Sequence, residues 1–334
     1  MIRGLIYEYP MKVNDILRGW KTVLSGHSPF LSIELTKECP LRCPGCYAYG
    51  EEHLGGDVLL TQVSDFKGQE LVRRFMELID RYKPLHVSIV GGEPLVRFRE
   101  LGEILPELER RGVVIQLVTS AVRPIPAEWA NNKLLTIVVS IDGLPAEHDV
   151  RRKPATYERI LKNIDGHLIT VHCTVTRQMT ERVGYLHDFM DFWAARPKTE
   201  KVWFSLFTPQ VGETSYEILP PEARRQVVRE LLDMRGKYPK LSMTKLAIEG
   251  FLEPPLNPSK CNFAQLTRSF TADLKTQFGP CQFGGNPDCS QCGCMASAGF
   301  NSMGKMKAPC GIPIQWIYDK SIKIGNVLAT LRGD

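Results

Sequence analysis

The chain has 334 residues, of which 43% are hydrophobic and 24% are charged, a balance typical of a globular protein with a large core. Its net charge of +5 allows an anionic ligand but does not indicate nucleic-acid binding. We expect a cytoplasmic protein without a transmembrane segment, because no run approaches the roughly 18 apolar residues that cross a bilayer and the N-terminus lacks a signal-peptide core.

The first predicted element is an amphipathic helix over residues 13–24, within an N-terminal segment that we place at residues 1–30. Basic residues are interspersed with its apolar positions, so the helix could lie on a membrane surface or pack its apolar stripe on the rest of the protein. The apolar positions at helical spacing are Val13, Ile16, Leu17, Trp20, Val23 and Leu24.

Strand and helix patterns then alternate up to about residue 250. Helical stretches, such as those at 66–82, 181–195 and 221–237, separate apolar, β-branched runs. This alternation predicts an α/β domain over residues 31–250, with a parallel sheet covered by helices, and it suits either an open barrel or a doubly wound sheet. The predicted strands lie at 31–36, 86–90, 113–119, 135–141, 168–176 and 201–207.

The sequence changes character near residue 252. Pro254, Pro255 and Pro258 form a linker-like stretch, and Gly-, Pro- and Cys-rich sequence follows to the end. We therefore predict a second, small, loop-rich domain over residues 251–334, which needs a metal because so short a segment buries little core.

Ten cysteines in a reducing compartment indicate metal centres rather than disulfides. Cys39, Cys43 and Cys46 directly follow the first predicted strand. Three thiolates at this spacing could hold three irons of a [4Fe–4S] cube and leave the fourth iron open. The alternative is a structural zinc site, for which His53 is the nearest fourth ligand.

A second motif, Gly91-Gly92-Glu93-Pro94, follows the second predicted strand. The glycines would let a ligand approach the backbone, and Glu93 could accept a hydrogen bond from a cationic amine. The motif could equally be a strand-to-helix turn with Pro94 at the helix start. The carboxyl ends of parallel strands meet at one edge of a sheet, so we expect both motifs at one ligand site.

Together, CPLRCPGCY at 39–47, GGEP at 91–94 and the region 139–152 resemble the radical S-adenosylmethionine (SAM) enzymes. The resemblance implies a partial (β/α)6 barrel, a [4Fe–4S] cluster on the three cysteines, and SAM bound at its open iron. It further implies reductive cleavage of SAM to a 5′-deoxyadenosyl radical, with an electron donor such as flavodoxin or ferredoxin. The SAM-binding residues it implies are Gly91, Gly92, Glu93, Pro94, Ser140, Asp142 and Arg152.

One departure from that family concerns the residue before the third cysteine. Many relatives carry an aromatic side chain there, near the adenine, whereas this chain has Gly45. Tyr47, just after Cys46, could take its place.

The C-terminal cysteines resemble the SPASM or shortened "twitch" extension, which carries auxiliary [4Fe–4S] clusters. Cys261 and Cys281 flank a predicted hairpin around residues 270–273, and a Cys-x-x-Cys-x-Cys run follows at 289–294. We expect one auxiliary cluster, although two clusters or a zinc ribbon remain open. The expected ligands are Cys261, Cys281, Cys289 and Cys292, with Cys294 or Cys310 as possible substitutes.

The resemblance implies an enzyme that modifies a peptide or protein. A small metabolite or a lipid precursor is the alternative substrate, and a non-catalytic two-cluster electron carrier is the alternative function. His172, on the polar face of the fifth strand, and Glu213, in the loop after the sixth, are the candidates for catalytic contact with substrate. A buried histidine satisfied by hydrogen bonds is the other interpretation of His172.

Overall fold

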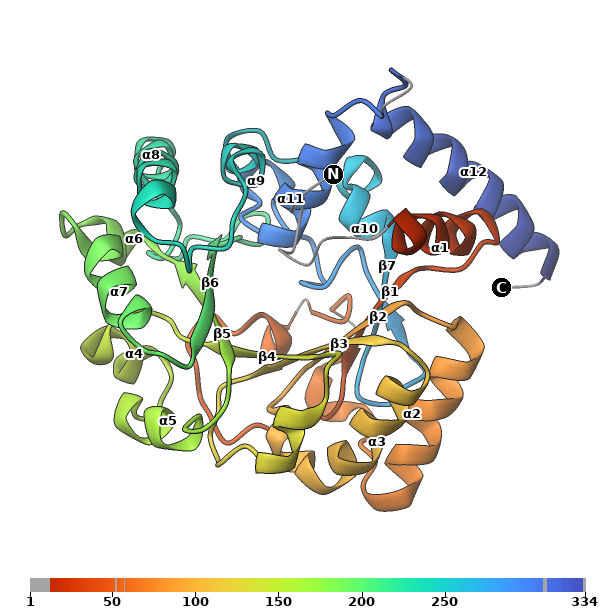
Figure 1. The fold of residues 1–334 in the computed structure, drawn as a ribbon, viewed down its shortest axis with the longest axis horizontal. Helices are drawn as coiled ribbons and strands as arrows, with labels where there is room; N and C mark the ends of the chain where they lie inside the picture. The colour runs from red at the N-terminus through yellow and green to blue at the C-terminus, as the bar shows by residue number, and fades with distance from the viewer. Residues whose placement is uncertain (1–12, 52, 57, 309–310, 333–334) are drawn as a thin grey trace.

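The computed structural model describes residues 13–51, 53–56, 58–308 and 311–332. Its centre is one eight-stranded sheet with the order β6-β5-β4-β3-β2-β1-β7-β8 (Figure 1). All pairings among β1 to β7 are parallel, and β8 runs antiparallel to β7. The strands are β1 (Phe30–Glu34), β2 (His86–Val90), β3 (Val114–Thr119), β4 (Leu135–Ser140), β5 (Ile169–Val175), β6 (Thr199–Leu206), β7 (Thr267–Phe270) and β8 (Gln277–Phe278).

The predicted partial (β/α)6 barrel is confirmed. All six predicted strands form, and the sheet stays open because β6 and β8 are its two edges. Helices line its outer side, while α10 and α11 lie across the other face (Figure 1). The helices are α1 (Val13–Leu24), α2 (Gly68–Tyr82), α3 (Phe98–Arg110), α4 (Pro145–Arg151), α5 (Tyr157–Asn163), α6 (Arg177–Thr180), α7 (Tyr185–Ala194), α8 (Pro221–Lys237), α9 (Lys245–Glu249), α10 (Asn262–Leu266), α11 (Met295–Gly304) and α12 (Ile314–Arg332).

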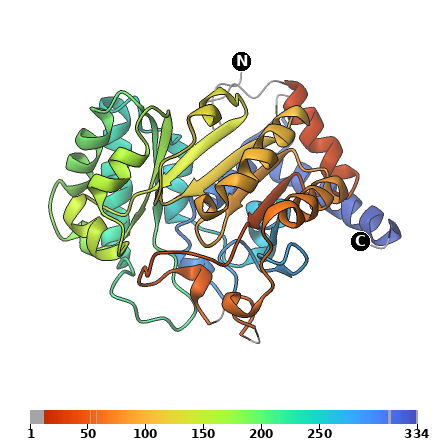
Figure 2. The same cartoon turned by 90° about the horizontal axis from the view of Figure 1, so that it is seen from below.

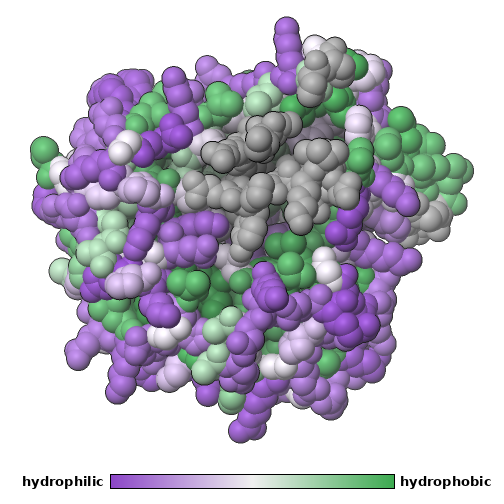
Figure 3. All heavy atoms as spheres, viewed as in Figure 1, coloured by the Kyte–Doolittle hydropathy of each residue, from purple (hydrophilic) through white to green (hydrophobic). Residues whose placement is uncertain are grey.

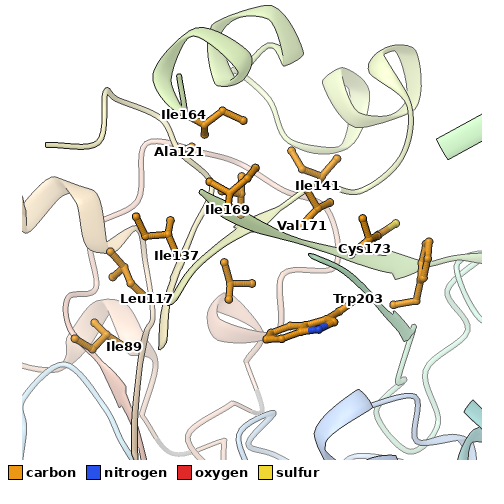
Figure 4. Packing of buried hydrophobic residues seen from close by; sticks show 14 of the residues in the cluster. Ile89, Leu117, Ala121, Ile137, Ile141, Ile164, Ile169, Val171, Cys173 and Trp203 are labelled. Carbon is orange, nitrogen blue, oxygen red and sulfur yellow. The ribbon is translucent and has the colours of Figure 1, made fainter. Parts of the chain in front are cut away.

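The main core lies between the sheet and its outer helices. Alternate residues of successive strands point outward, and Ile89, Leu117 and Ile137 lie side by side on β2, β3 and β4 (Figure 4). Cys173 is completely buried in the same layer, so this cysteine acts as a small hydrophobic residue. The opposite face of the sheet is left for the cavity described below.

The C-terminal part is more regular than its composition predicts. The expectation of a loop-rich segment to the end is wrong, because α11 and α12 together cover most of residues 295–332. Strand β7 also pairs with β1, which joins this part to the barrel sheet. Gly325 of α12 lies against the backbone of α1. A Cβ at this position would come 2.1 Å from the carbonyl oxygen of Val23, so only glycine lets α1 and α12 approach so closely.

Helix α1 forms as predicted and packs on α12. The indole Nε1 of Trp20 donates a hydrogen bond of 2.6 Å to Ser321 Oγ. Packing on the protein, one of the two interpretations of this helix, is therefore confirmed. None of the helices in the described part of the chain is both long and apolar enough to span a bilayer.

The long loop after β1 lies beside the β7–β8 hairpin, as Figure 2 shows from below. Ala48, Leu60 and Val63 from the loop form a small buried cluster with Ala272 from the hairpin turn. This contact brings the two cysteine-bearing parts of the sequence together.

Candidate active site and metal centres

A cavity of about 540 Å³ lies at the carboxyl ends of the barrel strands and extends into the barrel. It collects sequence-predicted residues that are far apart in the chain, as expected for a ligand site in a parallel α/β fold. Its lining does not include the predicted residues Cys39 and Pro94. The predicted residues that line it are Cys43, Cys46, Tyr47, Gly91, Gly92, Glu93, Ser140, Asp142, Arg152, His172, Glu213 and Cys294.

The cysteine triplet occupies the loop that leaves β1. All three thiols are free and partly exposed. Burial raises the pKa of Cys39 to about 11 and raises that of Cys43, so at neutral pH a metal would have to displace the proton from each. Gly45 turns the loop with a φ of +63°.

The structure gives a reason for the departure at Gly45. A Cβ at this position would lie 3.0 Å from Glu217 Oε2, so Glu217 occupies the space in which an aromatic side chain would begin. Tyr47 lines the cavity, and its ring lies edge-on to His53 and Phe283, with centroid distances of 5.6 Å to each. Its contact with adenine stays a prediction.

Both ring nitrogens of His53 contact groups other than the cysteines. Its Nε2 lies 2.6 Å from Glu34 Oε1, and its Nδ1 lies 3.0 Å from the carbonyl oxygen of Phe283. Tetrahedral zinc at ~2.3 Å from each sulfur would draw its ligands to within roughly 4 Å of one another. Among the described residues no three His, Cys, Asp or Glu side chains converge in that way.

Close packing against the cysteine loop leaves no room for a side chain at either glycine of the Gly-Gly-Glu-Pro turn. A Cβ at Gly91 would lie 2.3 Å from the Cβ of Glu34, and one at Gly92 would lie 2.4 Å from the carbonyl oxygen of Glu38. Both have positive φ angles. Besides the predicted approach of a ligand, these glycines let the turn pack against the start of the cysteine loop.

Glu93 is buried and already holds three hydrogen bonds. Its Oε1 accepts from the backbone N–H of Leu95 at 2.9 Å and from the hydroxyl of Thr119, and its Oε2 accepts from the N–H of Ser120 at 2.7 Å. It caps the short helix that begins at Pro94, which confirms the strand-to-helix turn. Burial raises its pKa against the opposing effect of these bonds. An amine could use only the remaining acceptor capacity of Oε2.

Asp142, which is buried, and Arg152, which is partly buried, form an ion pair on the cavity wall. Arg152 Nε donates to Asp142 Oδ2 at 2.7 Å, and its Nη1 donates to Ser120 Oγ at 2.9 Å. Burial favours the neutral acid, but the charges of Arg152 and Arg151 outweigh it and lower the pKa of Asp142 far below its ordinary value. Arg152 is therefore held in place at the cavity.

A neighbouring ion pair, Arg151–Glu217, was not predicted from the sequence. Arg151 Nη1 donates to Glu217 Oε1 at 2.7 Å, and Glu217 Oε2 is buried without a hydrogen-bond partner among the described residues. Glu217 lies in the loop after β6, where no motif marks it. No periodicity in the sequence indicates that Glu217 lies beside the cysteine loop.

His172 and Glu213 both reach the cavity wall. His172 Nε2 lies 2.8 Å from Ser205 Oγ, and burial lowers its pKa to about 4, so the imidazole is neutral. Glu213 Oε2 accepts a hydrogen bond of 2.9 Å from the N–H of Gln210. The catalytic roles of both residues stay predictions.

The C-terminal cysteines gather beside this cavity. The predicted hairpin forms as β7–β8, with Asp273 in its turn accepting from the N–H groups of Lys275 and Thr276. Cys310 lies outside the described residues. One small second cavity is lined by Cys261, Cys281, Cys289, Cys292 and Cys294.

Gly293 anchors this group to the barrel. Its carbonyl accepts from the N–H of Leu206 at 2.8 Å, and its N–H donates to Thr208 Oγ1 at 2.8 Å. A Cβ there would lie 2.1 Å from the carbonyl oxygen of Leu206. The neighbouring Cys294 lines both cavities, so it sits between the two predicted metal centres.

An open parallel barrel with a three-cysteine loop and a glycine turn around one cavity defines the class of protein. Residues 33–168 match the family model of the radical SAM superfamily. The resemblance drawn from the sequence is confirmed.

Similar proteins cover different shares of the chain. "Molybdenum cofactor biosynthesis protein 1" of Drosophila melanogaster is 31% identical over 188 residues, which are 51% of this chain and 30% of that protein. The chain spans about a third of the length of the curated relatives that it matches.

Two solved structures share the fold over most of the chain. "Native anSMEcpe with bound AdoMet" has a TM-score of 0.55 at 14% identity and covers 91% of this chain and 97% of that one. "Crystal structure of Streptococcus suis SuiB bound to precursor peptide SuiA" has a TM-score of 0.54 at 16% identity, with 94% and 70% covered. The similarity therefore continues beyond the barrel into the cysteine-rich segment.

Proposed function

We propose that this chain is a radical SAM enzyme that cleaves SAM reductively to a 5′-deoxyadenosyl radical and abstracts hydrogen from a carbon of its substrate. The observation that carries the proposal is the meeting of Cys43, Cys46, the Gly91–Glu93 turn and Asp142–Arg152 around one cavity. A two-cluster electron carrier has no use for a ligand cavity beside its open cysteine loop.

The residues present fit a cluster with one open iron. Cys39, Cys43 and Cys46 would hold it, and His53, the nearest imidazole along the chain, has both ring nitrogens engaged elsewhere. When bound, the cluster supplies one electron and a chelation site for the amino and carboxylate groups of SAM.

The protein's own groups would position SAM. Arg152 offers its guanidinium to a carboxylate, and Glu93 offers Oε2 to an amine. Both lie on the wall of the cavity that contains Cys43 and Cys46. The neutral imidazole of His172 and the carboxylate of Glu213 would face the substrate, because both line the same cavity.

The second cysteine group would hold one auxiliary [4Fe–4S] cluster. Four thiolates close such a cube, and five described cysteines surround the second cavity. Our preferred ligands remain Cys261, Cys281, Cys289 and Cys292. This leaves Cys294, which also faces the main cavity, as the substitute.

The proposed substrate is a peptide or protein side chain. Two proteins similar to this chain are named for peptides: the structure of SuiB bound to its precursor peptide, and "PqqA peptide cyclase" of Rhodopseudomonas palustris, 32% identical over 117 residues. A small metabolite is the second candidate, favoured by "7-carboxy-7-deazaguanine synthase" of Hyperthermus butylicus, 37% identical over 93 residues. A flavodoxin or ferredoxin would supply the electron in the cytoplasm.

The test is anaerobic reconstitution with iron and sulfide, reduction with dithionite, and addition of SAM. We expect 5′-deoxyadenosine from the wild type and none from Cys43→Ala. Cys173→Ala is the matched control, because this thiol is buried in the outer core and should leave turnover intact. No nucleoside from reconstituted wild type would overturn the assignment, and deuterium transfer from a labelled peptide would identify the substrate.

A further inference from the structure

Helix α12 leaves an apolar stripe uncovered at one end of the molecule. Trp316, Ile324, Val327 and Leu331 are 53%, 51%, 61% and 78% exposed. Their spacing places them on one face of the helix. Figure 3 shows hydrophobic side chains gathered at the right-hand edge of the molecule, over the α12 of Figure 1.

Helix α1 extends this apolar face. Ser321 and Gly325, on an adjoining face of α12, pack against Trp20 and Val23 of α1. Leu17 and Trp20 remain 54% and 40% exposed beside that contact. The two helices thus present one surface, the α1–α12 face, which consists of the exposed side chains Leu17, Trp20, Trp316, Ile324, Val327 and Leu331.

The charges on the α1–α12 face are mainly basic. Arg18, Lys21, Lys320 and Lys323 are exposed, and none has an ion-pair partner among the described residues. The ammonium of Lys320 lies 5.8 Å from the centre of the Trp316 ring. The acidic Asp319 is hydrogen-bonded to Gln315.

We propose that the α1–α12 face docks on an anionic membrane surface, with both helices lying in the headgroup plane. Exposed aliphatic side chains, tryptophans at the border and lysines among them are the composition that such a surface recognises. Lysine stems can extend along the apolar stripe while their ammonium groups reach the phosphates. This proposal does not depend on the proposed reaction.

Docking would bring the membrane close to one end of the active-site cavity. Val23, Tyr318 and Ile322 pack behind the α1–α12 face on a small core that contains Phe300. Phe300 also lines the main cavity. Membrane attachment would therefore bring this aromatic end of the cavity near the lipid surface.

The experiment is co-sedimentation of the full chain with vesicles of phosphatidylcholine alone or with about 30% phosphatidylglycerol. We expect binding to the anionic vesicles, weakened by salt, and little binding to the neutral ones. Val327→Glu and Leu331→Glu should each reduce partitioning roughly tenfold. Lys320→Gln and Lys323→Gln should each reduce it about fivefold.

Matched controls keep the result interpretable. Val183→Glu changes a side chain that is 90% exposed, in the connection between α6 and α7, which Figure 1 shows on the side of the molecule opposite α12. Lys133→Gln removes an exposed lysine that precedes β4. Both variants should bind vesicles like the wild type, and circular dichroism should show every variant folded.

Three outcomes would overturn the proposal. The first is no binding to either vesicle, and the second is equal binding by the wild type and Val327→Glu. The third is a dimer in sedimentation equilibrium that Val327→Glu dissociates, which would assign the face to a second copy of the chain. Formation of 5′-deoxyadenosine by the same preparations tests the reaction separately.

Discussion

His53 Nε2 lies 2.6 Å from Glu34 Oε1, and this buried pair joins three parts of the chain. Glu34 ends β1, His53 lies in the loop that follows the cysteines, and His53 Nδ1 meets the carbonyl of Phe283 in the C-terminal segment. A carbonyl only accepts, so Nδ1 carries a proton and a further proton lies between Nε2 and the carboxylate. The charged Glu34–His53 pair therefore links the two segments that carry the predicted metal centres.

From the Glu34–His53 pair we expect a free energy of unfolding that depends on pH. Burial lowers the pKa of His53, but the hydrogen bond to Glu34 and its negative charge outweigh burial and raise it above 6.5. The stabilisation is therefore fully present below about pH 6.5 and is lost as the pH rises through the folded-state value. Urea unfolding at pH 6 should show His53→Gln less stable than wild type by about 3 kcal/mol, and the difference should shrink toward pH 9.

His187→Gln, on α7, is the control for the exchange of side chains. It should shift stability little at pH 6. If His53→Gln were as stable as the wild type at pH 6, the stabilising role of the charged Glu34–His53 pair would be wrong.

The Gly-Gly-Glu-Pro turn predicts a steric effect. Gly91→Ala would place a methyl group 2.3 Å from the Cβ of Glu34, at a φ of +78°, so the turn must move or unfold. We expect a loss of about 2 kcal/mol or more and weaker SAM binding. Gly102→Ala, in α3 with open space around it, should instead stabilise by about 0.5–1 kcal/mol. Thermal melts of both variants check this, and equal melting temperatures would contradict it.

Arg152 predicts a binding effect. Arg152→Lys keeps the charge but cannot hold Asp142, Ser120 and a ligand carboxylate together, because lysine lacks the planar fork. Equilibrium dialysis should show SAM affinity of the reconstituted protein reduced roughly tenfold or more, with unchanged iron content. The exposed neighbour variant Lys153→Gln should bind SAM normally. An unchanged affinity in Arg152→Lys would remove Arg152 from the SAM site.

From the second cysteine group we expect iron to remain bound when the cysteine triplet is removed. The triple variant Cys39→Ala, Cys43→Ala, Cys46→Ala should retain about four irons per chain after reconstitution, because one auxiliary cube remains. Adding Cys281→Ala should reduce this content, whereas adding Cys294→Ala should not if Cys294 is no ligand. One zinc and no iron in the triple variant would establish a zinc ribbon instead.

Local patterns predicted much of the fold and part of the site. The six strands, helix α1 and the hairpin after Cys261 follow from periodicity and turn residues, which depend on neighbours in the chain. The cysteine triplet and the glycine turn were found because their chemistry lies within a few residues. Helix α12 was missed because Gly325 and its surroundings resemble a loop in composition.

Sequence alone determined which chemistry is available: three cysteines at a close spacing, a second group of cysteines, and a barrel whose strands end at one edge. Only the tertiary structure decided which groups meet. The Glu34–His53 pair, the Arg151–Glu217 pair and the position of Cys294 between two cavities depend on contacts across many residues. Such contacts arise from the packing of whole elements, and no local pattern encodes them.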